Sequence, residues 1–243
     1  MILALLHGFT GSGRSFDHLR ERLDARFHVI APDLPGHGTS PDATGWDDAL
    51  DSLAKTLEPS PLCLAGYSMG ARLALAYALR FPDRVRALVL ESGSPGIAGD
   101  DERAGRKFED EALATFAERE GVEAFVARWE QHPTLASLRD LPEPLAATLH
   151  ERRLRNRALG LASALRHLGA GAQPSLWEEL PTLRAKTLLV AGERDPKFRA
   201  IAQSMARAIP DARLRLFARA GHAPHLESPD EYAEALLDHF TEA

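Results

Sequence analysis

The feature that most constrains the fold of this chain is a regular alternation of short apolar runs with longer amphipathic stretches. The runs end near glycine or proline, and strands of this kind joined by helices form parallel sheets of the α/β class. Each run is almost continuously apolar, so we expect helices on both faces of the sheet. The predicted strands are Ile2–Leu6, His28–Ala31, Leu62–Ala65, Ala87–Glu91, Thr187–Ala191 and Arg213–Phe217, and the predicted helices are Ser15–Leu23, Asp47–Leu57, Met69–Arg80, Arg199–Ala208 and Pro229–Phe240.

The alternation stops between about residues 99 and 180, where charged amphipathic stretches dominate and no strand is evident. A loop of that length without secondary structure is rare inside a compact domain. We therefore predict a helical cap at 99–180, inserted into an α/β core formed by residues 1–98 and 181–243. A mostly parallel sheet with helices on both faces would form this core.

The composition of the chain limits which kinds of molecule it can bind. With 243 residues, 44% hydrophobic and 26% charged, the chain can form one large globular domain with an insertion. The net charge of −6 and the lack of a basic tail argue against nucleic acid as a partner. The apolar start is too short to span a membrane and has no basic segment before it. We expect a small-molecule ligand and a monomer or small homo-oligomer.

The single cysteine, Cys63, lies inside an apolar run, so no disulfide framework can form and a cytoplasmic location is favoured. The histidines lack the paired spacing of a zinc motif. There is no Walker loop, and Gly8, Gly11 and Gly13 do not form a dinucleotide-binding G-x-G-x-x-G. We predict no metal and no cofactor.

The motif G-x-S-x-G stands at residues 66–70, between a predicted strand and a predicted helix. A serine on so tight a turn has a strained backbone and needs small neighbours, which Gly66 and Gly70 provide. The helix that begins at Met69 directs its free N–H groups and positive dipole end to the same place. This context predicts Ser68 as a nucleophile or base.

A serine hydroxyl needs a histidine to take its proton and an acid to orient that histidine. Asp195 and His222 each follow a predicted strand, at the sheet edge where ligands of parallel sheets bind. Glu193 could replace Asp195 as the acid, and His225 could replace His222 as the base. We favour Asp195 because it lies further beyond its strand, and His222 because it follows Gly221 directly.

An anionic oxygen formed in the reaction needs two donors. The glycines of the loop at residues 7–11 allow the backbone N–H of Phe9 to face the pocket beside the N–H of Met69, which predicts an oxyanion hole. His7 is interpreted as a structural histidine that holds this loop. The turn at residues 33–40, rich in proline and glycine, is also interpreted as structural.

Four motifs in this order resemble the α/β-hydrolase superfamily: H-G-F-T-G at 7–11, D-L-P-G-H-G at 33–38, G-Y-S-M-G at 66–70 and G-H at 221–222. The resemblance implies the α/β-hydrolase fold over almost the whole chain. It leaves the substrate open, because this fold hosts many reactions. Members usually carry a strand pair before the first motif, so we expect the sheet to lack that pair here.

A narrower resemblance is to the MenH family, the 2-succinyl-6-hydroxy-2,4-cyclohexadiene-1-carboxylate synthases of bacterial menaquinone synthesis. It rests on segments 66–72, 91–96, 101–106, 129–138 and 192–198, several of which fall in the predicted cap. The resemblance implies a lyase that removes pyruvate from 2-succinyl-5-enolpyruvyl-6-hydroxy-3-cyclohexene-1-carboxylate. Ser68, assisted by His222 and Asp195, would abstract a proton.

Such a polycarboxylate substrate needs fixed positive charge. All basic residues except Lys55, Lys107, Lys186 and Lys197 are arginines, which suit carboxylates, although genome composition could produce the same bias.

Arg72 lies one helical turn after Ser68 and on the same face, with a structural ion pair as the alternative role. Arg106 and Arg153 match cap arginines of the family, although Arg152, Arg155 and Arg157 crowd the second position. Tyr67 and Trp129 match aromatic pocket positions, with plain cap packing as the alternative for Trp129.

Two other functions fit the same residues. A serine carboxylesterase or carbon–carbon bond hydrolase would use Ser68, His222 and Asp195 through an acyl-enzyme or hydrated intermediate. A ligand-binding receptor would keep the fold and use the cap as a lid.

Overall fold

A computed structural model describes residues 1–58 and 61–242. Its six-stranded sheet runs in the order β2-β1-β3-β4-β5-β6, and every pairing is parallel. The strands are β1 (Ile2–Leu6), β2 (His28–Ile30), β3 (Leu62–Tyr67), β4 (Val85–Glu91), β5 (Lys186–Gly192) and β6 (Ala212–Phe217). The predicted α/β class is confirmed, and the described residues include no strand pair before β1.

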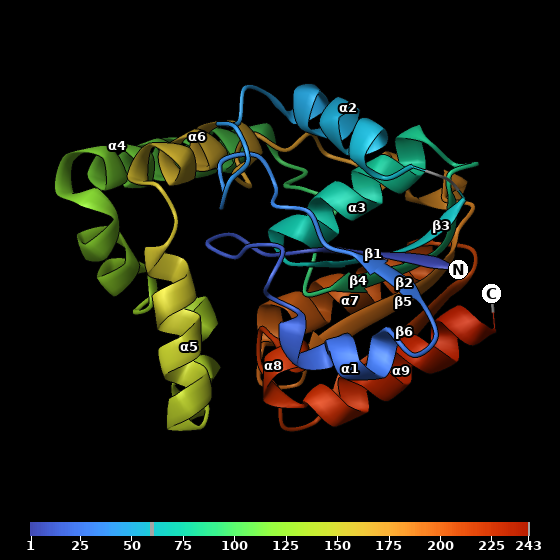
Figure 1. The fold of residues 1–243 in the computed structure, drawn as a ribbon. Coiled ribbons are helices and arrows are strands. Elements are labelled where there is room, and N and C mark those ends of the chain that lie inside the picture. Colours follow the sequence, from blue (N-terminus) through green and yellow to red (C-terminus); the bar gives the residue numbers. More distant parts are fainter. Residues whose placement is uncertain (59–60, 243) are drawn as a thin grey trace.

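Helices cover both faces of the sheet because successive strand residues point to opposite sides. Ala4 and Leu6 enter a core shared with α2 (Trp46–Thr56), α3 (Met69–Arg80) and α7 (Pro196–Ala208). Leu3 and Leu5 enter the opposite core, built with α1 (Arg20–Leu23), the preceding 3-10 turn η1 (Asp17–Leu19) and α9 (Pro229–Thr241). Figure 1 shows α2 and α3 on one side of the sheet and α1 and α9 on the other.

Several predicted boundaries were wrong by a few residues. Strand β3 continues two residues beyond Ala65, because Gly66 and Tyr67 still pair with β4. Helix α7 begins at Pro196, since proline suits the first helical position and Asp195 caps the helix. The predicted helix Ser15–Leu23 is shorter, with η1 followed by one turn of α1. The edge strand β6 is also less buried than a continuous apolar run implies.

Only helices lie between β4 and β5. They are α4 (Asp100–Trp129), η2 (Pro133–Asp140), α5 (Glu143–Leu154), α6 (Ala158–Leu168) and η3 (Trp177–Thr182). Helix α4 bends at Gly121, whose φ of 83° interrupts the helical backbone. Its first part packs against α6 through a small apolar cluster that includes Ala114, Ala117 and Leu165. Helices α4, α5 and α6 stand beside the sheet in Figure 1.

The remaining described helix, α8 (Pro224–Glu227), lies in the segment between β6 and α9 and begins two residues after His222. Among the described residues, no helix is both long and apolar enough to cross a membrane.

Candidate active site

Ser68 occupies a strained turn between β3 and α3. Its φ of 52° and ψ of −109° lie in a region that residues other than glycine rarely adopt. A Cβ on Gly66 would lie 2.4 Å from the Gly70 carbonyl oxygen, and one on Gly70 would lie 2.1 Å from that of Leu6. The turn therefore requires both glycines, as the motif predicted.

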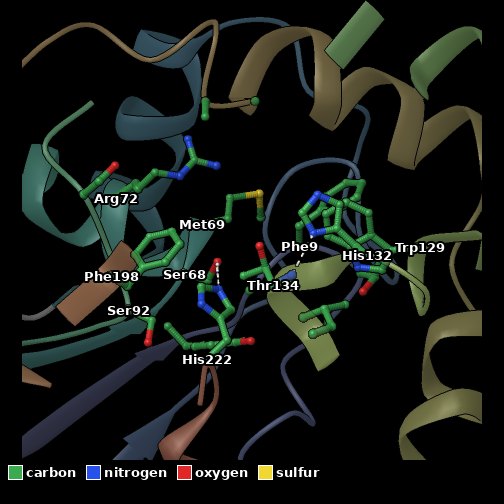
Figure 2. Close-up of a pocket in the computed structure, with 18 of the residues that line it drawn as sticks. Phe9, Ser68, Met69, Arg72, Ser92, Trp129, His132, Thr134, Phe198 and His222 are labelled. Atoms are coloured by element: carbon green, nitrogen blue, oxygen red, sulfur yellow. Dashed lines mark hydrogen bonds between the residues drawn. The ribbon is translucent and has the colours of Figure 1, made fainter. Parts of the chain in front are cut away.

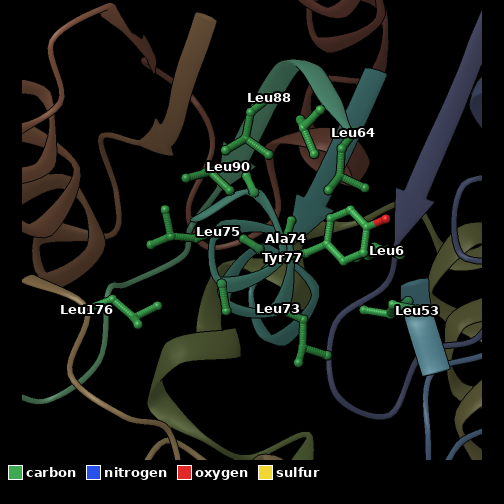
Figure 3. Packing of buried hydrophobic residues seen from close by; sticks show 14 of the residues in the cluster. Leu6, Leu53, Leu64, Leu73, Ala74, Leu75, Tyr77, Leu88, Leu90 and Leu176 are labelled. Carbon is green, nitrogen blue, oxygen red and sulfur yellow. The ribbon is translucent and has the colours of Figure 1, made fainter. Parts of the chain in front are cut away.

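Helix α3 fixes this turn to the middle of the protein. Its residues from Leu73 to Ala78 are buried, and the Tyr77 ring is fully enclosed. Figure 3 shows Ala74 and Tyr77 packed among Leu64, Leu88 and Leu90 of the neighbouring strands. Because the helix cannot shift without disturbing this core, the position of Ser68 is set by packing as well as by the turn.

Ser68, His222 and Asp195 form a chain of hydrogen bonds. Ser68 Oγ lies 3.1 Å from His222 Nε2, and His222 Nδ1 lies 2.8 Å from Asp195 Oδ2. The other oxygen, Oδ1, accepts the Phe198 N–H at 3.1 Å, which caps α7 and fixes the carboxylate. Asp195 and His222 are buried, and Figure 2 shows the imidazole directly below the serine hydroxyl. This geometry allows the imidazole to take the serine proton while the carboxylate orients it.

The two alternatives are placed elsewhere. Glu193 is exposed, and its side chain has no hydrogen bond to His222. His225 is buried and donates its Nδ1–H to Glu91 at 2.8 Å. Of the residues considered for these two positions, the structure brings Asp195 and His222 to Ser68.

The backbone N–H groups of Phe9 and Met69 are free for an anionic oxygen. Neither donates a hydrogen bond to any part of the chain that the structure describes, and both residues line the same cavity as Ser68. Met69 is the first residue of α3, so the positive end of the helix dipole adds to the field there. The arrangement can hold an oxyanion or enolate oxygen.

His7 holds the Phe9 loop as a neutral imidazole. Its Nε2 accepts the Leu34 N–H at 2.9 Å, so Nδ1 carries the proton and donates to the Gly8 carbonyl at 2.8 Å. Burial lowers the pKa of His7 to about 4. His37 acts similarly beside it, because its Nε2 accepts the Thr10 N–H at 3.2 Å and burial lowers its pKa to about 3.

A cavity of about 490 Å³ opens above Ser68 and His222, a size that suits a small organic substrate. It lies between the sheet edge and the helices at 99–180. Its cationic side chains are Arg72, Arg106, Arg152, Arg153 and Lys197, and its aromatic side chains include Phe9, Tyr67, Trp129 and Phe198. Within the described residues, no group of three or more His, Cys, Asp or Glu side chains could hold a metal ion.

Arg72 faces the cavity without a carboxylate partner among the described ion pairs. Its guanidinium donates to Gln173 Oε1 at 3.2 Å and lies 5.9 Å from the Trp46 ring centroid. Burial lowers the pKa of Arg72 to about 10, still far above neutrality. The structural ion pair that was the alternative role of Arg72 is therefore not formed. Figure 2 shows its side chain on the Met69 side of the cavity.

Arg106 and Arg153 line the cavity while each is held by an acid. Arg106 Nε donates to the buried Asp110 at 2.8 Å, and Arg153 Nη1 donates to Glu130 at 2.9 Å. Each pair orients its guanidinium and leaves other N–H groups for a ligand. Arg153 Nε is buried and has no partner among the described residues.

The four arginines at residues 152–157 fall into two groups, those that line the cavity and those that do not. Arg152 lines the cavity beside Arg153, whereas Arg155 and Arg157 are exposed and do not line it. Arg157 instead pairs with Asp42 at 2.7 Å. Asn156 ties this segment to the core, since its amide donates to the Thr10 carbonyl at 2.9 Å.

Two predicted aromatic residues, Trp129 and Tyr67, each pack against two rings near the site. Trp129 lies 5.0 Å from Phe9 and 5.2 Å from His132, measured between ring centroids, so it packs against the predicted oxyanion loop. Tyr67 lies 5.5 Å from the His222 ring and 4.5 Å from the His225 ring. Trp129 also lines the cavity, so both positions considered for it, within the packing of residues 99–180 and at the pocket, are occupied by the same ring.

Sequence reasoning missed Phe198, Lys197 and His132 as cavity residues. Phe198 packs against the His222 ring at 4.6 Å between centroids, and Lys197 precedes it. Both lie in the first turn of α7 after the capping Asp195, a position that could have indicated them. His132 lies just after α4, within segment 129–138 that carries the family resemblance, but nothing in that segment singles out its side chain.

The chain matches the model of the Alpha/beta hydrolase family over residues 3–235, and it belongs to this family.

A Bacillus subtilis (strain 168) protein, provisionally named 2-succinyl-6-hydroxy-2,4-cyclohexadiene-1-carboxylate synthase, is 39% identical over 97% of this chain and 89% of its own. The structure of MenH from S. aureus matches with a TM-score of 0.94 at 35% identity, covering 100% of this chain and 94% of that one.

A thermophilic esterase from Thermogutta terrifontis, solved with malate bound, matches with a TM-score of 0.86 at 26% identity. The match covers 100% of this chain and 90% of the esterase. The resemblance to the superfamily and to MenH is therefore confirmed.

Proposed function

We propose that this protein is a carbon–oxygen lyase of menaquinone synthesis. It would eliminate pyruvate from 2-succinyl-5-enolpyruvyl-6-hydroxy-3-cyclohexene-1-carboxylate. The observation that carries the proposal is the cavity itself, in which Ser68 and His222 lie together with Arg72, a half-buried cation that forms no ion pair with a carboxylate among the described residues. The name of the B. subtilis relative and the match to S. aureus MenH support the same reaction.

The reaction would begin with removal of the proton on the ring carbon that bears the succinyl ketone. His222 takes the Ser68 proton, Asp195 stabilises the imidazolium, and Ser68 Oγ abstracts the carbon-bound proton. The resulting enolate oxygen lies at the N–H groups of Phe9 and Met69. Collapse of the enolate restores the ketone and shifts the ring double bond to form the conjugated diene. The carbon–oxygen bond to the enolpyruvyl group breaks, and the departing enolate takes the proton held by His222 to become pyruvate. No water is consumed and no acyl-enzyme forms.

The arginines would hold the substrate carboxylates. Arg72 lies on the Met69 side of the cavity, while Arg106 and Arg153 come from α4 and α5. Bidentate pairing of guanidinium with carboxylate would fix the ring over Ser68. Tyr67 and Trp129 would pack against its apolar parts. In this proposal, residues 99–180 act as a cap that encloses the substrate, and the protein works in the cytoplasm.

A serine esterase is the second candidate. The hydrogen-bonded Ser68, His222 and Asp195 suit acyl transfer equally well, and the Thermogutta terrifontis esterase matches in structure. The cationic lining favours the lyase, because a neutral ester does not need several guanidinium groups in a partly buried cavity. A receptor would have no need for a serine bonded to an imidazole.

Two assays run side by side separate the candidates. The unstable substrate is generated in situ and pyruvate release is followed, while p-nitrophenyl acetate reports ester turnover. We expect fast pyruvate release by the wild type, loss of it in Ser68→Ala and Arg106→Ala, and little ester turnover. Arg155→Ala is the control, because Arg155 also lies within residues 99–180 but is exposed and does not line the cavity. Pyruvate release at the uncatalysed rate, beside strong Ser68-dependent ester hydrolysis, would reject the lyase.

A further inference from the structure

Glu91 stands at the carboxyl end of β4, beside the strand that leads into Ser68. It is fully buried, and its register partner on β3 is Tyr67. Its main-chain carbonyl accepts the Ser68 N–H at 2.8 Å. The strained turn that carries the serine is therefore attached directly to Glu91.

The Glu91 carboxylate reaches the loop that carries His222. Its Oε1 accepts two hydrogen bonds from His225, one from the backbone N–H at 3.0 Å and one from the ring Nδ1–H at 2.8 Å. His225 follows His222 by three residues, and its carbonyl accepts the ring Nε2–H of His18 at 2.7 Å. One residue thus holds both the backbone of Ser68 and the loop of His222.

Glu227 holds the same loop from its other side. Its two carboxylate oxygens accept the N–H groups of Gly221 at 2.8 Å and Ala223 at 2.9 Å, which flank His222. Glu227 is only half-buried and has no hydrogen bond to the Ser68 turn among the described residues. Glu91 is the carboxylate that connects the two parts of the site.

Stability alone does not explain a charged residue in this place. Burying a carboxylate beside an imidazole costs solvation, and packed apolar side chains often replace such pairs without loss of stability. Hydrogen bonds to defined atoms supply what apolar contacts do not, a fixed direction and distance between β4 and the loop.

We propose that Glu91 is a positioning residue of the active site, which sets the approach of Ser68 Oγ to His222 Nε2 through its carbonyl and its bonds to His225. The inference rests on the proposed role of Ser68 and His222 as a proton-transfer pair. It assigns a role to two residues outside that pair, one of which was an alternative for the base.

The test is the rate at which a fluorophosphonate labels Ser68, because this reaction needs the Ser68–His222 pair and no natural substrate. The rate constant reports the geometry of each folded site, whereas the final labelled fraction reports how much protein is folded. Glu91→Gln removes the charge of the pair, and His225→Leu removes the ring donor. His225→Asn is the conservative variant, because its amide nitrogen replaces Nδ1 as donor.

Asp33→Asn is the matched control. Asp33 also accepts backbone N–H groups, from Gly13 at 2.7 Å and Thr39 at 2.9 Å, but its turn does not carry His222. Loss of its charge should change stability without changing the labelling rate constant.

We expect the labelling rate constant to fall about 10- to 100-fold in Glu91→Gln and His225→Leu, as for a misplacement near 1 Å. Labelling still goes to completion, KM for the lyase substrate stays within about twofold, and kcat falls with the labelling rate. His225→Asn and Asp33→Asn keep the wild-type rate constant.

Unchanged rate constants with a smaller labelled fraction would overturn the proposal and leave Glu91 a purely structural role. If the Glu91 variant does not fold, the two His225 variants test the proposal without it. A labelling rate constant that falls in His225→Leu but not in His225→Asn supports the proposal, and equal rate constants overturn it. A wild type that labels rapidly but releases no pyruvate would reject the lyase function and leave the result on Glu91 standing.

Discussion

Replacing Gly70 by alanine should damage both stability and catalysis. The new Cβ would lie 2.1 Å from the Leu6 carbonyl oxygen and 2.6 Å from that of His7, so β1 and α3 must separate by about 1 Å to reach an ordinary contact. Overpacking costs about 1–3 kcal/mol, and backbone atoms cannot rotate away. The cost here therefore lies at the upper end of that range, about 3 kcal/mol, and after the gain of about 1 kcal/mol from alanine in a helix we expect the free energy of unfolding to fall by about 2 kcal/mol.

The same displacement moves the loop of Phe9 away from Met69. A misplacement near 1 Å costs about 100-fold in rate, so kcat/KM for pyruvate release should fall by about that factor. Urea denaturation measures the first effect and initial rates measure the second. Gly105→Ala is the matched control: a Cβ there meets nothing within 4 Å, so this α4 variant should gain about 0.5–1 kcal/mol and keep full activity. Wild-type stability or wild-type kcat/KM in Gly70→Ala would refute the reasoning.

Three further predictions concern His7, Arg72 and Cys63. His7 alone should lower the free energy of unfolding by about 2 kcal/mol between pH 7 and pH 5. Its pKa is near 4 in the folded protein and near 6.5 in the unfolded chain, so the unfolded chain binds the proton first as the pH falls. Urea titrations that show no such loss of stability would contradict this prediction. Arg72→Met should raise KM about 10- to 100-fold through loss of a charged hydrogen bond while leaving stability unchanged or higher, and an unaltered KM would remove Arg72 from the substrate site. Cys63 is buried and burial raises its thiol pKa to about 11, so a thiol reagent at pH 8 should label it only in urea; labelling of the native protein would show that this thiol is accessible.

The sequence predicted the parts of the fold that leave a local pattern. Apolar runs marked the strands, and the glycines around Ser68 marked the turn, because each constraint acts within a few residues. Asp195 and His222 could be placed with Ser68 because strands in a parallel sheet end at one edge. Their geometry agrees with that prediction, and their catalytic roles stay a prediction.

The interactions between distant residues could not be predicted in this way. Glu91 and His225 are 134 positions apart, and nothing near either residue indicates their bond. Arg153 lies in α5 and its partner Glu130 lies at the end of α4. The relative position of these two helices depends on the packing of all residues from 99 to 180. The bend of α4 at Gly121 was missed for a similar reason, because a lone glycine in a helical pattern does not show whether its φ is positive.

The most direct test of the central claim is the initial rate of pyruvate release with substrate deuterated at the ring carbon that bears the succinyl group. If Ser68 and His222 remove that proton, the wild type releases pyruvate far above background, deuteration lowers kcat/KM, and Ser68→Ala releases none above background. Release at the same rate by wild type and Ser68→Ala would contradict the account.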